Sequence, residues 1–242
     1  MIETATEVQL WRGSLDLQDA ALHEAYAVLS GDEIERARRY KFPRDRGRFV
    51  GARAFLRRTL AEYLSVSPRE LAFIYGPFGK PGLSPPFAGE TLEFNLSHSG
   101  DVAVLAVARD APVGVDVEQV IRVANLQGIA SRFFSAYENA RLNAAPAYAR
   151  ELAFYYCWTR KEAFLKALGD GLAHPLDSFD VSLDERQARL VAIRGDREAA
   201  SMWSLVHLCP APGYVAALAI KGIRVRAVWR SPRSTMENAT RC

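Results

Sequence analysis

An eight-residue segment occurs twice in this chain, 113 positions apart. GDVAVLAV, which begins at Gly100, matches GYVAALAI, which begins at Gly213, at five of eight positions. A helical segment, AFLR at residues 54–57, recurs 109 positions later as AFLK at residues 163–166. Because a helix and then a strand recur in the same order at similar offsets, the sequence predicts two related halves joined near residues 109–113.

Both halves combine helical and strand patterns, so the sequence predicts an α+β fold of two similar α/β subdomains. We expect an N-terminal subdomain over residues 1–112, a C-terminal subdomain over 113–230 and a flexible tail over 231–242. Helical patterns cover 18–29, 33–41, 45–64, 124–144 and 148–168. Strand patterns cover 8–12, 71–75, 92–96, 101–108, 113–118, 178–183, 188–194, 202–208, 214–220 and 223–229.

The composition favours a cytoplasmic protein without disulfides. Of the 242 residues, 49% are hydrophobic and 24% charged, which is enough apolar material for a packed core. No apolar run reaches the roughly 18 residues that span a bilayer, and the first ten residues lack the features of a signal peptide. We therefore expect no membrane contact. The three cysteines are scattered without zinc-binding spacing, which predicts neither a disulfide framework nor a structural zinc site.

Positive charge is concentrated in one segment. Residues 36–58 hold ten basic residues and a single acid, Asp45, a local charge of +9 in a chain whose formal net charge is +3. Such an excess attracts a polyanion, which could be nucleic acid, phospholipid or a phosphorylated small molecule. An ordinary solvated helix face explains the same charges equally well.

Two carboxylates alternate with valines in the segment VGVDVE, residues 113–118. This period of two is typical of a half-buried strand and places Asp116 and Glu118 on one face, with Cα atoms about 6.6–6.8 Å apart. Two carboxylates so placed can converge on a hard cation. The alternative is a strand whose outer face is simply acidic.

A second group lies in WTRKEAFLK, residues 158–166, within the predicted helix 148–168. Trp158, Glu162 and Lys166 follow one another at intervals of four and therefore line one side of that helix. An ordinary surface Glu–Lys pair is the alternative. The flanking aromatic and aliphatic residues instead indicate a mostly buried helix, in which charged groups need partners such as a metal ion and a phosphate.

Two further segments are suited to binding anions. Ser97 and His98 lie in FNLSHS, residues 94–99, between two predicted strands, although a lone histidine is more often structural. Lys80 lies in GPFGKP, residues 76–81, within a long loop rich in proline and glycine. Ile74 and Pro81 stand where a Walker A sequence needs glycine and serine or threonine, which excludes a P-loop, and no Rossmann fingerprint is present.

Taken in order, the four motifs closely resemble the signature of the Sfp-type 4′-phosphopantetheinyl transferases, over residues 30–180. The resemblance implies a monomer of two similar α+β halves related by a pseudo-twofold axis, with the active site between them. It further implies transfer of phosphopantetheine from coenzyme A, the co-substrate, to a serine of an apo acyl or peptidyl carrier protein, with Mg²⁺ as cofactor.

The resemblance also implies roles for single residues. The metal ligands would be Asp116, Glu118 and Glu162. Lys166 would contact the transferred phosphate. The coenzyme A phosphates would be held by Lys80, Ser97, His98, Lys161 and Lys166, and its 3′-phosphate by Arg36, Arg48 and Arg53.

The general base is the open assignment. FFSAYE, residues 133–138, matches the family segment that supplies a further active-site acid, which would be Glu138. The same residues have the spacing of a capping box, in which Ser135 caps a helix and Glu138 reaches back to the Ser135 amide. Were Glu138 the cap, the proton would go to Glu118 or to a metal-bound water.

Two other functions fit parts of the sequence. A non-catalytic nucleic-acid-binding module would use the basic run 36–58, although its aromatic residues are not placed for base stacking. A magnesium-dependent phosphohydrolase acting on coenzyme A-like diphosphates would share the carboxylates and need no carrier protein. We expect no nucleic acid among the partners.

Overall fold

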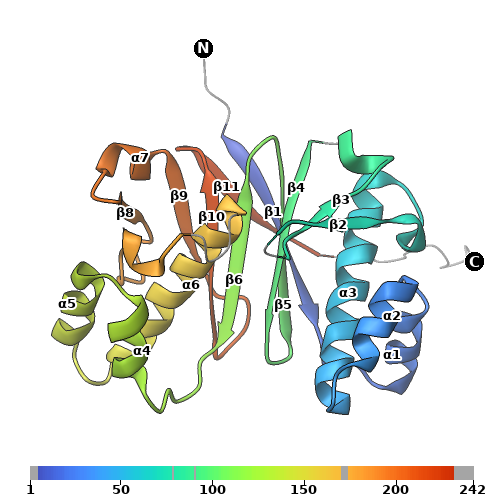
Figure 1. The fold of residues 1–242 in the computed structure, drawn as a ribbon, viewed down its shortest axis with the longest axis horizontal. Coiled ribbons are helices and arrows are strands. Elements are labelled where there is room, and N and C mark those ends of the chain that lie inside the picture. The colour runs from blue at the N-terminus through green and yellow to red at the C-terminus, as the bar shows by residue number, and fades with distance from the viewer. Residues whose placement is uncertain (1–4, 78, 90, 170–173, 232–242) are drawn as a thin grey trace, which may run out of the picture.

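The computed structural model describes residues 5–77, 79–89, 91–169 and 174–231, and it has the α+β fold predicted from sequence. Strands occupy the middle of the molecule and helices flank them on both sides (Figure 1). The first half contains β1 (Thr6–Ser14), α1 (Asp19–Tyr26), α2 (Gly31–Arg38), α3 (Pro43–Leu64), β2 (Phe73–Tyr75), β3 (Pro81–Leu83), β4 (Leu92–Ser99) and β5 (Val102–Arg109). The second contains β6 (Val113–Gln119), α4 (Leu126–Phe133), α5 (Ala136–Ala144), α6 (Arg150–Leu168), β7 (Phe179–Val181), β8 (Leu190–Ile193), α7 (Arg197–Ser201), β9 (Trp203–Leu208), β10 (Tyr214–Lys221) and β11 (Val225–Arg230).

The sequence repeat corresponds to a repeated unit of structure. Its two copies form β5 and β10, and each pairs antiparallel with the strand before it, β4 or β9. The two helical copies lie in α3 and α6, which cover opposite sides of the strands (Figure 1). The predicted pair of related halves is therefore present in the fold.

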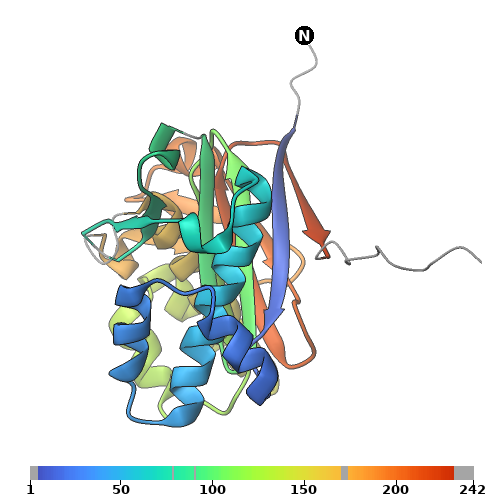
Figure 2. The ribbon, with the colours of Figure 1, turned by 90° about the vertical axis from the view of Figure 1, so that its right-hand side faces the viewer.

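The last strand of the second half joins the sheet of the first half. One sheet has the strand order β11-β1-β5-β4 and the other β6-β10-β9. Strand β11, which the sequence assigned to the subdomain 113–230, pairs in parallel with β1 of the first sheet, with Val225 opposite Thr6. Figure 2 shows β11 beside β1 in a second view. The last strand of the predicted C-terminal subdomain thus belongs to the first sheet, and the subdomain bounds stay a prediction. The predicted tail lies outside the described residues from 232 onward.

A shared core holds the sheets together. One buried apolar cluster contains side chains from both sheets, including Leu10 and Val104 from the first and Val115 and Leu218 from the second. No helix in the described part of the chain is long and apolar enough to cross a membrane.

The predicted helix 124–144 is two helices. Phe134 has extended backbone angles, and the Ser135 side chain accepts a hydrogen bond from the Glu138 amide, so a new helix begins there. The capping sequence thus outweighs the continuous helical pattern. The five-residue helix α7 is not among the sequence predictions, because it is too short to show a period.

Glycine at position 114 allows α6 to lie directly against β6. A Cβ atom added there would stand 2.1 Å from the Ala163 carbonyl oxygen and 2.3 Å from the Ala167 nitrogen, both in the main chain of α6. Because main chain cannot rotate away as a side chain can, only glycine permits this approach. The contact brings the helix that carries Glu162 and Lys166 against the strand that carries Asp116.

We expect Gly114→Ala to lower the free energy of unfolding by about 3 kcal/mol, near the upper end of overpacking costs, and to lower turnover because α6 must move away from β6. The control is Gly47→Ala in α3, where an added Cβ meets nothing within 4 Å and alanine favours the helix by up to about 1 kcal/mol. Urea unfolding of both variants checks this. Equal stability of the two variants would contradict it.

Candidate active site

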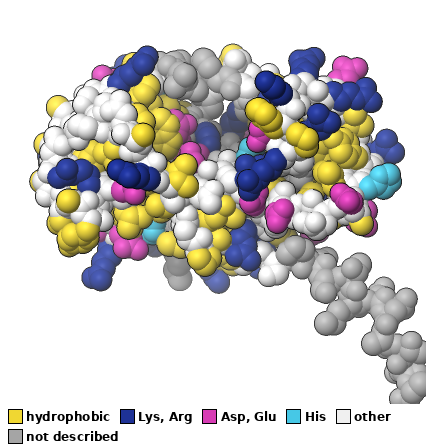
Figure 3. Space-filling view, turned by 90° about the horizontal axis from the view of Figure 1, so that it is seen from below, with side chains coloured by type: hydrophobic (Ala, Val, Ile, Leu, Met, Phe, Trp, Pro, Cys, Tyr) yellow, Lys and Arg dark blue, Asp and Glu magenta, His cyan; other side chains and the backbone are white. Residues whose placement is uncertain are grey.

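The site lies where the edges of the two sheets meet. Viewed from below, the molecular surface is hollowed between the halves, and acidic and basic side chains border the hollow (Figure 3). Strand β4 is the edge of one sheet and β6 is the edge of the other. They are joined by side chains of β4 that accept hydrogen bonds from main-chain amides of β6. These bonds run from Val115, Val117 and Gln119 to Asn95, Ser97 and Ser99, over 2.8, 3.3 and 3.1 Å respectively.

Asp116 is the centre of the site. Its side chain is buried, and its Oδ1 accepts hydrogen bonds from Lys166 Nζ at 2.5 Å and from Ser97 Oγ at 3.0 Å. Its other oxygen, Oδ2, is buried and has no hydrogen-bond partner. A buried carboxylate oxygen without a partner carries a large desolvation cost, which a bound cation would offset.

Glu118 and Glu162 lie close enough to Asp116 to feel its charge. Burial raises the pKa of both carboxyls, and the negative charge of Asp116 raises each pKa further. A hydrogen bond from Ser99 Oγ to Glu118 Oε2, 2.7 Å long, opposes the rise at Glu118. The three carboxylates therefore lie near enough to interact, and their role as metal ligands stays a prediction.

The three carboxylates suit a hard divalent cation by their chemistry. Among the described residues, no three acidic, histidine or cysteine side chains already stand in the geometry of a metal site. The Lys166 ammonium takes the place next to Asp116, and its side chain is 30% exposed, so it can turn toward solvent. The unpartnered Oδ2 of Asp116, with the carboxylates of Glu118 and Glu162 near enough to interact with Asp116, fits a cation.

Positive groups extend from this cluster into the first half. Desolvation, then the charges of Lys166 and Arg48, lower the pKa of His98, which places His98 near both. Lys80 donates a hydrogen bond to the Val113 carbonyl oxygen at 3.2 Å, and burial lowers the pKa of its ammonium group. The structure therefore brings His98 and Arg48 near Lys166, and it places Lys80 at the start of β6.

Arg48 is held in place by acids of its own half. Its Nε donates to Asp101 Oδ1 at 2.8 Å, and Arg44 donates to the other oxygen of Asp101 at 3.1 Å. Arg36 is exposed, and its guanidinium lies 5.4 Å from the centre of the Phe49 ring. Neither Arg44 nor Asp101 stands out in the sequence, since no local pattern links residues 57 positions apart.

Arg53, predicted to bind the 3′-phosphate, is instead enclosed. It forms an ion pair with Glu33 at 2.5 Å, and Arg57 forms a second at 2.6 Å to the other oxygen. All three side chains are at least nine-tenths buried. This buried triad fixes α2 against α3. The basic run 36–58 is consequently not one solvated face, because part of its charge is used inside the fold.

Lys161 and Glu138 form a second enclosed pair, with 2.7 Å between Nζ and Oε1. Neither side chain is exposed, and Lys161 also donates to the carbonyl oxygens of Leu176 and Phe179 at 2.6 and 2.7 Å. Glu138 accepts from the Ser135 amide at 2.8 Å, which completes the capping box. Of the two sequence alternatives, this placement favours the helix cap for Glu138, and it leaves no face of Lys161 open to coenzyme A.

Arg53, Lys161 and Glu138 are therefore the predicted site residues that the structure places in buried ion pairs. The residue that sequence reasoning missed is Ser99, which touches Glu118 directly. The alternation of polar residues at 95, 97 and 99 shows that they share a face, but it does not say which strand that face meets.

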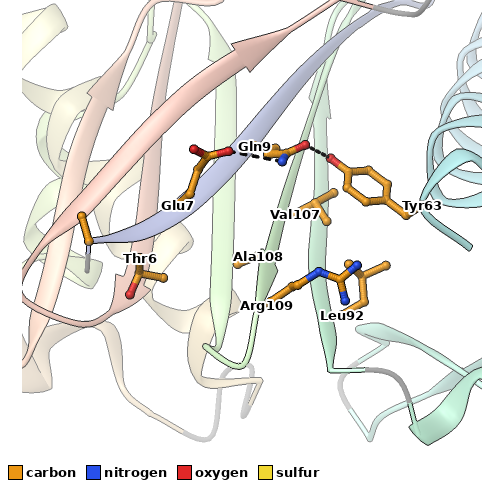
Figure 4. A pocket seen from close by; sticks show the side chains of 9 residues that line it. Thr6, Glu7, Gln9, Tyr63, Leu92, Val107, Ala108 and Arg109 are labelled. Carbon is orange, nitrogen blue, oxygen red and sulfur yellow. Dashed lines mark hydrogen bonds between the residues drawn. The ribbon is translucent and has the colours of Figure 1, made fainter. Parts of the chain in front are cut away.

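A cavity of about 310 Å³ lies elsewhere, between β1, α3 and the ends of β4 and β5 (Figure 4). Its polar groups bond to one another: the Tyr63 hydroxyl donates to Gln9 at 2.6 Å, and Gln9 donates to Glu7 at 3.3 Å. None of the residues predicted for the site lines it.

We expect Glu138→Gln to lower the free energy of unfolding by about 3 kcal/mol, because it leaves the Lys161 charge buried without its partner while glutamine still serves the capping box. Adding Lys161→Met should recover part of the loss, since no unpaired charge then remains. Denaturant unfolding of the single and double variants measures both effects. Unchanged stability together with a hundredfold loss of turnover would restore Glu138 as the base.

Comparison with known proteins identifies the family of this chain. The family model described as the 4′-phosphopantetheinyl transferase superfamily matches residues 112–219, and the one described as 4′-phosphopantetheinyl transferase, N-terminal, matches residues 14–110. The 4′-phosphopantetheinyl transferase HetI of Nostoc is 39% identical over 216 residues, which are 89% of this chain and 88% of HetI. The 4′-phosphopantetheinyl transferase Sfp of Bacillus subtilis is 32% identical, over 66% of this chain and 68% of Sfp. As the motifs predicted, the chain belongs to the 4′-phosphopantetheinyl transferase superfamily.

Proposed function

We propose that this protein transfers the 4′-phosphopantetheinyl group of coenzyme A to a serine hydroxyl of an apo acyl or peptidyl carrier protein and releases adenosine 3′,5′-bisphosphate. The observation that carries the proposal is the Asp116–Lys166–Ser97 contact at the junction of the halves, with Glu118 and Glu162 beside it. Names of relatives such as HetI and Sfp support the same activity.

Asp116, Glu118 and Glu162 would hold Mg²⁺. When bound, the ion would neutralise and orient the diphosphate of coenzyme A. Lys166, freed from Asp116, would hold the negative charge of the phosphoryl group being transferred. Lys80 and His98 would bind the coenzyme A phosphates, and Arg48 the 3′-phosphate.

In the transfer step, the carrier-protein serine oxygen bonds to the phosphorus that bears pantetheine, and the bond from that phosphorus to the bridging oxygen of the diphosphate breaks. The serine proton would pass to Glu118, directly or through a water. No covalent enzyme intermediate is needed, since positioning and charge stabilisation suffice.

The decisive experiment incubates the protein with coenzyme A, Mg²⁺ and a panel of apo carrier proteins and reads intact mass. We expect the phosphopantetheine adduct on at least one carrier protein. Release of phosphopantetheine with no carrier protein present would instead point to a phosphohydrolase. Salt-sensitive binding of RNA or DNA without binding of coenzyme A would point to a nucleic-acid-binding module.

We expect Asp116→Asn, Glu118→Gln and Glu162→Gln each to lower turnover by about 10²-fold or more, because each removes a charge that acts on the reacting diphosphate. The control is Glu62→Gln on the exposed side of α3. Circular dichroism and turnover are measured on the same samples. Near-normal turnover in any two of the three variants would refute the carboxylate site.

We expect Arg48→Ala to reduce the preference for coenzyme A over dephospho-coenzyme A by about tenfold, because a charge-assisted contact contributes about 1.5–3 kcal/mol. Arg38→Ala, at an exposed position of α2, should leave the preference unchanged. The ratio of kcat/KM for the two substrates measures this. Equal ratios in wild type and Arg48→Ala would remove Arg48 from 3′-phosphate recognition.

A further inference from the structure

Ser99, the last side chain of the β4–β6 contact, has no role in the function proposed above. Its Oγ accepts a hydrogen bond from the Gln119 amide at 3.1 Å and donates one to Glu118 Oε2 at 2.7 Å. The Gln119 amide is itself fixed, because β6 is paired with β10 and Gln119 lies opposite Tyr214. With one lone pair engaged by that amide, the single hydroxyl proton is directed to Glu118.

The same arrangement occurs two residues earlier. Ser97 Oγ accepts from the Val117 amide at 3.3 Å and donates to Asp116 Oδ1 at 3.0 Å. Each serine therefore joins the strands and also holds the carboxylate that lies one position before the bonded amide.

Asn95 joins β4 to β6 without a hydrogen bond to a carboxylate of the described residues, so it serves as a comparison for the two serines. Its side-chain oxygen accepts the Val115 amide at 2.8 Å, and the residue before Val115 is Gly114, which has no carboxylate. A side-chain acceptor is enough there. Hydroxyl groups, which can accept and donate at once, stand at the two positions where the neighbouring residue of β6 is acidic.

We propose that Ser99 is a positioning residue, which holds Glu118 in the orientation in which it meets Asp116 and Glu162 around a divalent cation. The inference rests on the proposed function, because it takes Glu118 as a ligand of that cation. Glu118 lies on β6, in the second half of the molecule. Ser99 thus supplies the contact from the other half of the molecule.

The test measures binding of Mn²⁺, as the probe cation, by the electron paramagnetic resonance signal of the free ion. We expect Ser99→Ala to weaken Mn²⁺ binding about tenfold, the lower end of the effect of losing a group that orients a metal ligand. Ser99→Thr keeps a hydroxyl and should bind within twofold of wild type. The matched control is Ser204→Ala on β9, where the hydroxyl donates only to the Gly222 carbonyl oxygen, at 2.6 Å.

A second measurement separates positioning from general damage. In Ser99→Ala, the Mn²⁺ concentration needed for half-maximal turnover should rise about tenfold, while KM for coenzyme A at saturating Mn²⁺ stays within twofold. Should Ser99→Ala melt below the assay temperature, Ser99→Cys replaces it, since a thiol is nearly the same size but a weak donor.

Mn²⁺ binding by Ser99→Ala that equals wild type would overturn the proposal. So would a loss in Ser99→Thr as large as that in Ser99→Ala, because the hydroxyl would then not be the group that matters. Wild-type Mn²⁺ binding by Glu118→Gln is a different outcome. It would remove Glu118 from the metal site and so refute that part of the proposed function.

Discussion

Three hydrogen bonds between β4 side chains and β6 amides join the two sheets and determine where the functional groups lie. Both strands are sheet edges, so without these bonds the amides of Val115 and Val117 would be buried without partners at about 1–3 kcal/mol each. The amides that face β4 belong to alternate residues. The acidic side chains of Asp116 and Glu118 lie between them, while Val115 and Val117 enter the shared core. One strand register therefore fixes the core, the junction and the carboxylates together.

Exposure separates the charges that a ligand can reach from those that hold the fold. The Glu33 triad and the Glu138–Lys161 pair are closed on all sides, and their hydrogen bonds are directed into the protein. Lys166 pairs with Asp116 at a similar distance, yet its side chain is 30% exposed. A closed pair resists exchange because breaking it leaves a buried charge, whereas Lys166 can release Asp116 and remain solvated.

The sequence predicted most of the fold and the proximity of the residues around Asp116, because both depend on short-range periodicity, while the roles of those residues stay predictions. The period of two placed Asp116 and Glu118 together, and the spacing of four placed Glu162 beside Lys166. The sequence did not show which charged residues are buried in ion pairs. Arg53 is closed off by Glu33, which is 20 positions away, and strand β11 pairs with β1 from the opposite end of the chain. Such contacts depend on tertiary packing, which no local pattern encodes.

The repeat duplicates the framework of the molecule, but the two copies differ in the side chains at the candidate site. The two repeated strands are β5 and β10. Strand β1 pairs with β5 as β6 pairs with β10, and β9 pairs with β10 as β4 pairs with β5. The positions of Asp116 and Glu118 are then taken in the first half by Arg12 and Ser14, and those of Asn95 and Ser97 in the second half by Leu205 and His207. The second copy of the junction therefore lacks both the carboxylates and the side chains that hold them. The carboxylates of Asp116 and Glu118 on β6 and the hydroxyls of Ser97 and Ser99 on β4 therefore meet only at the β4–β6 contact, among the described residues.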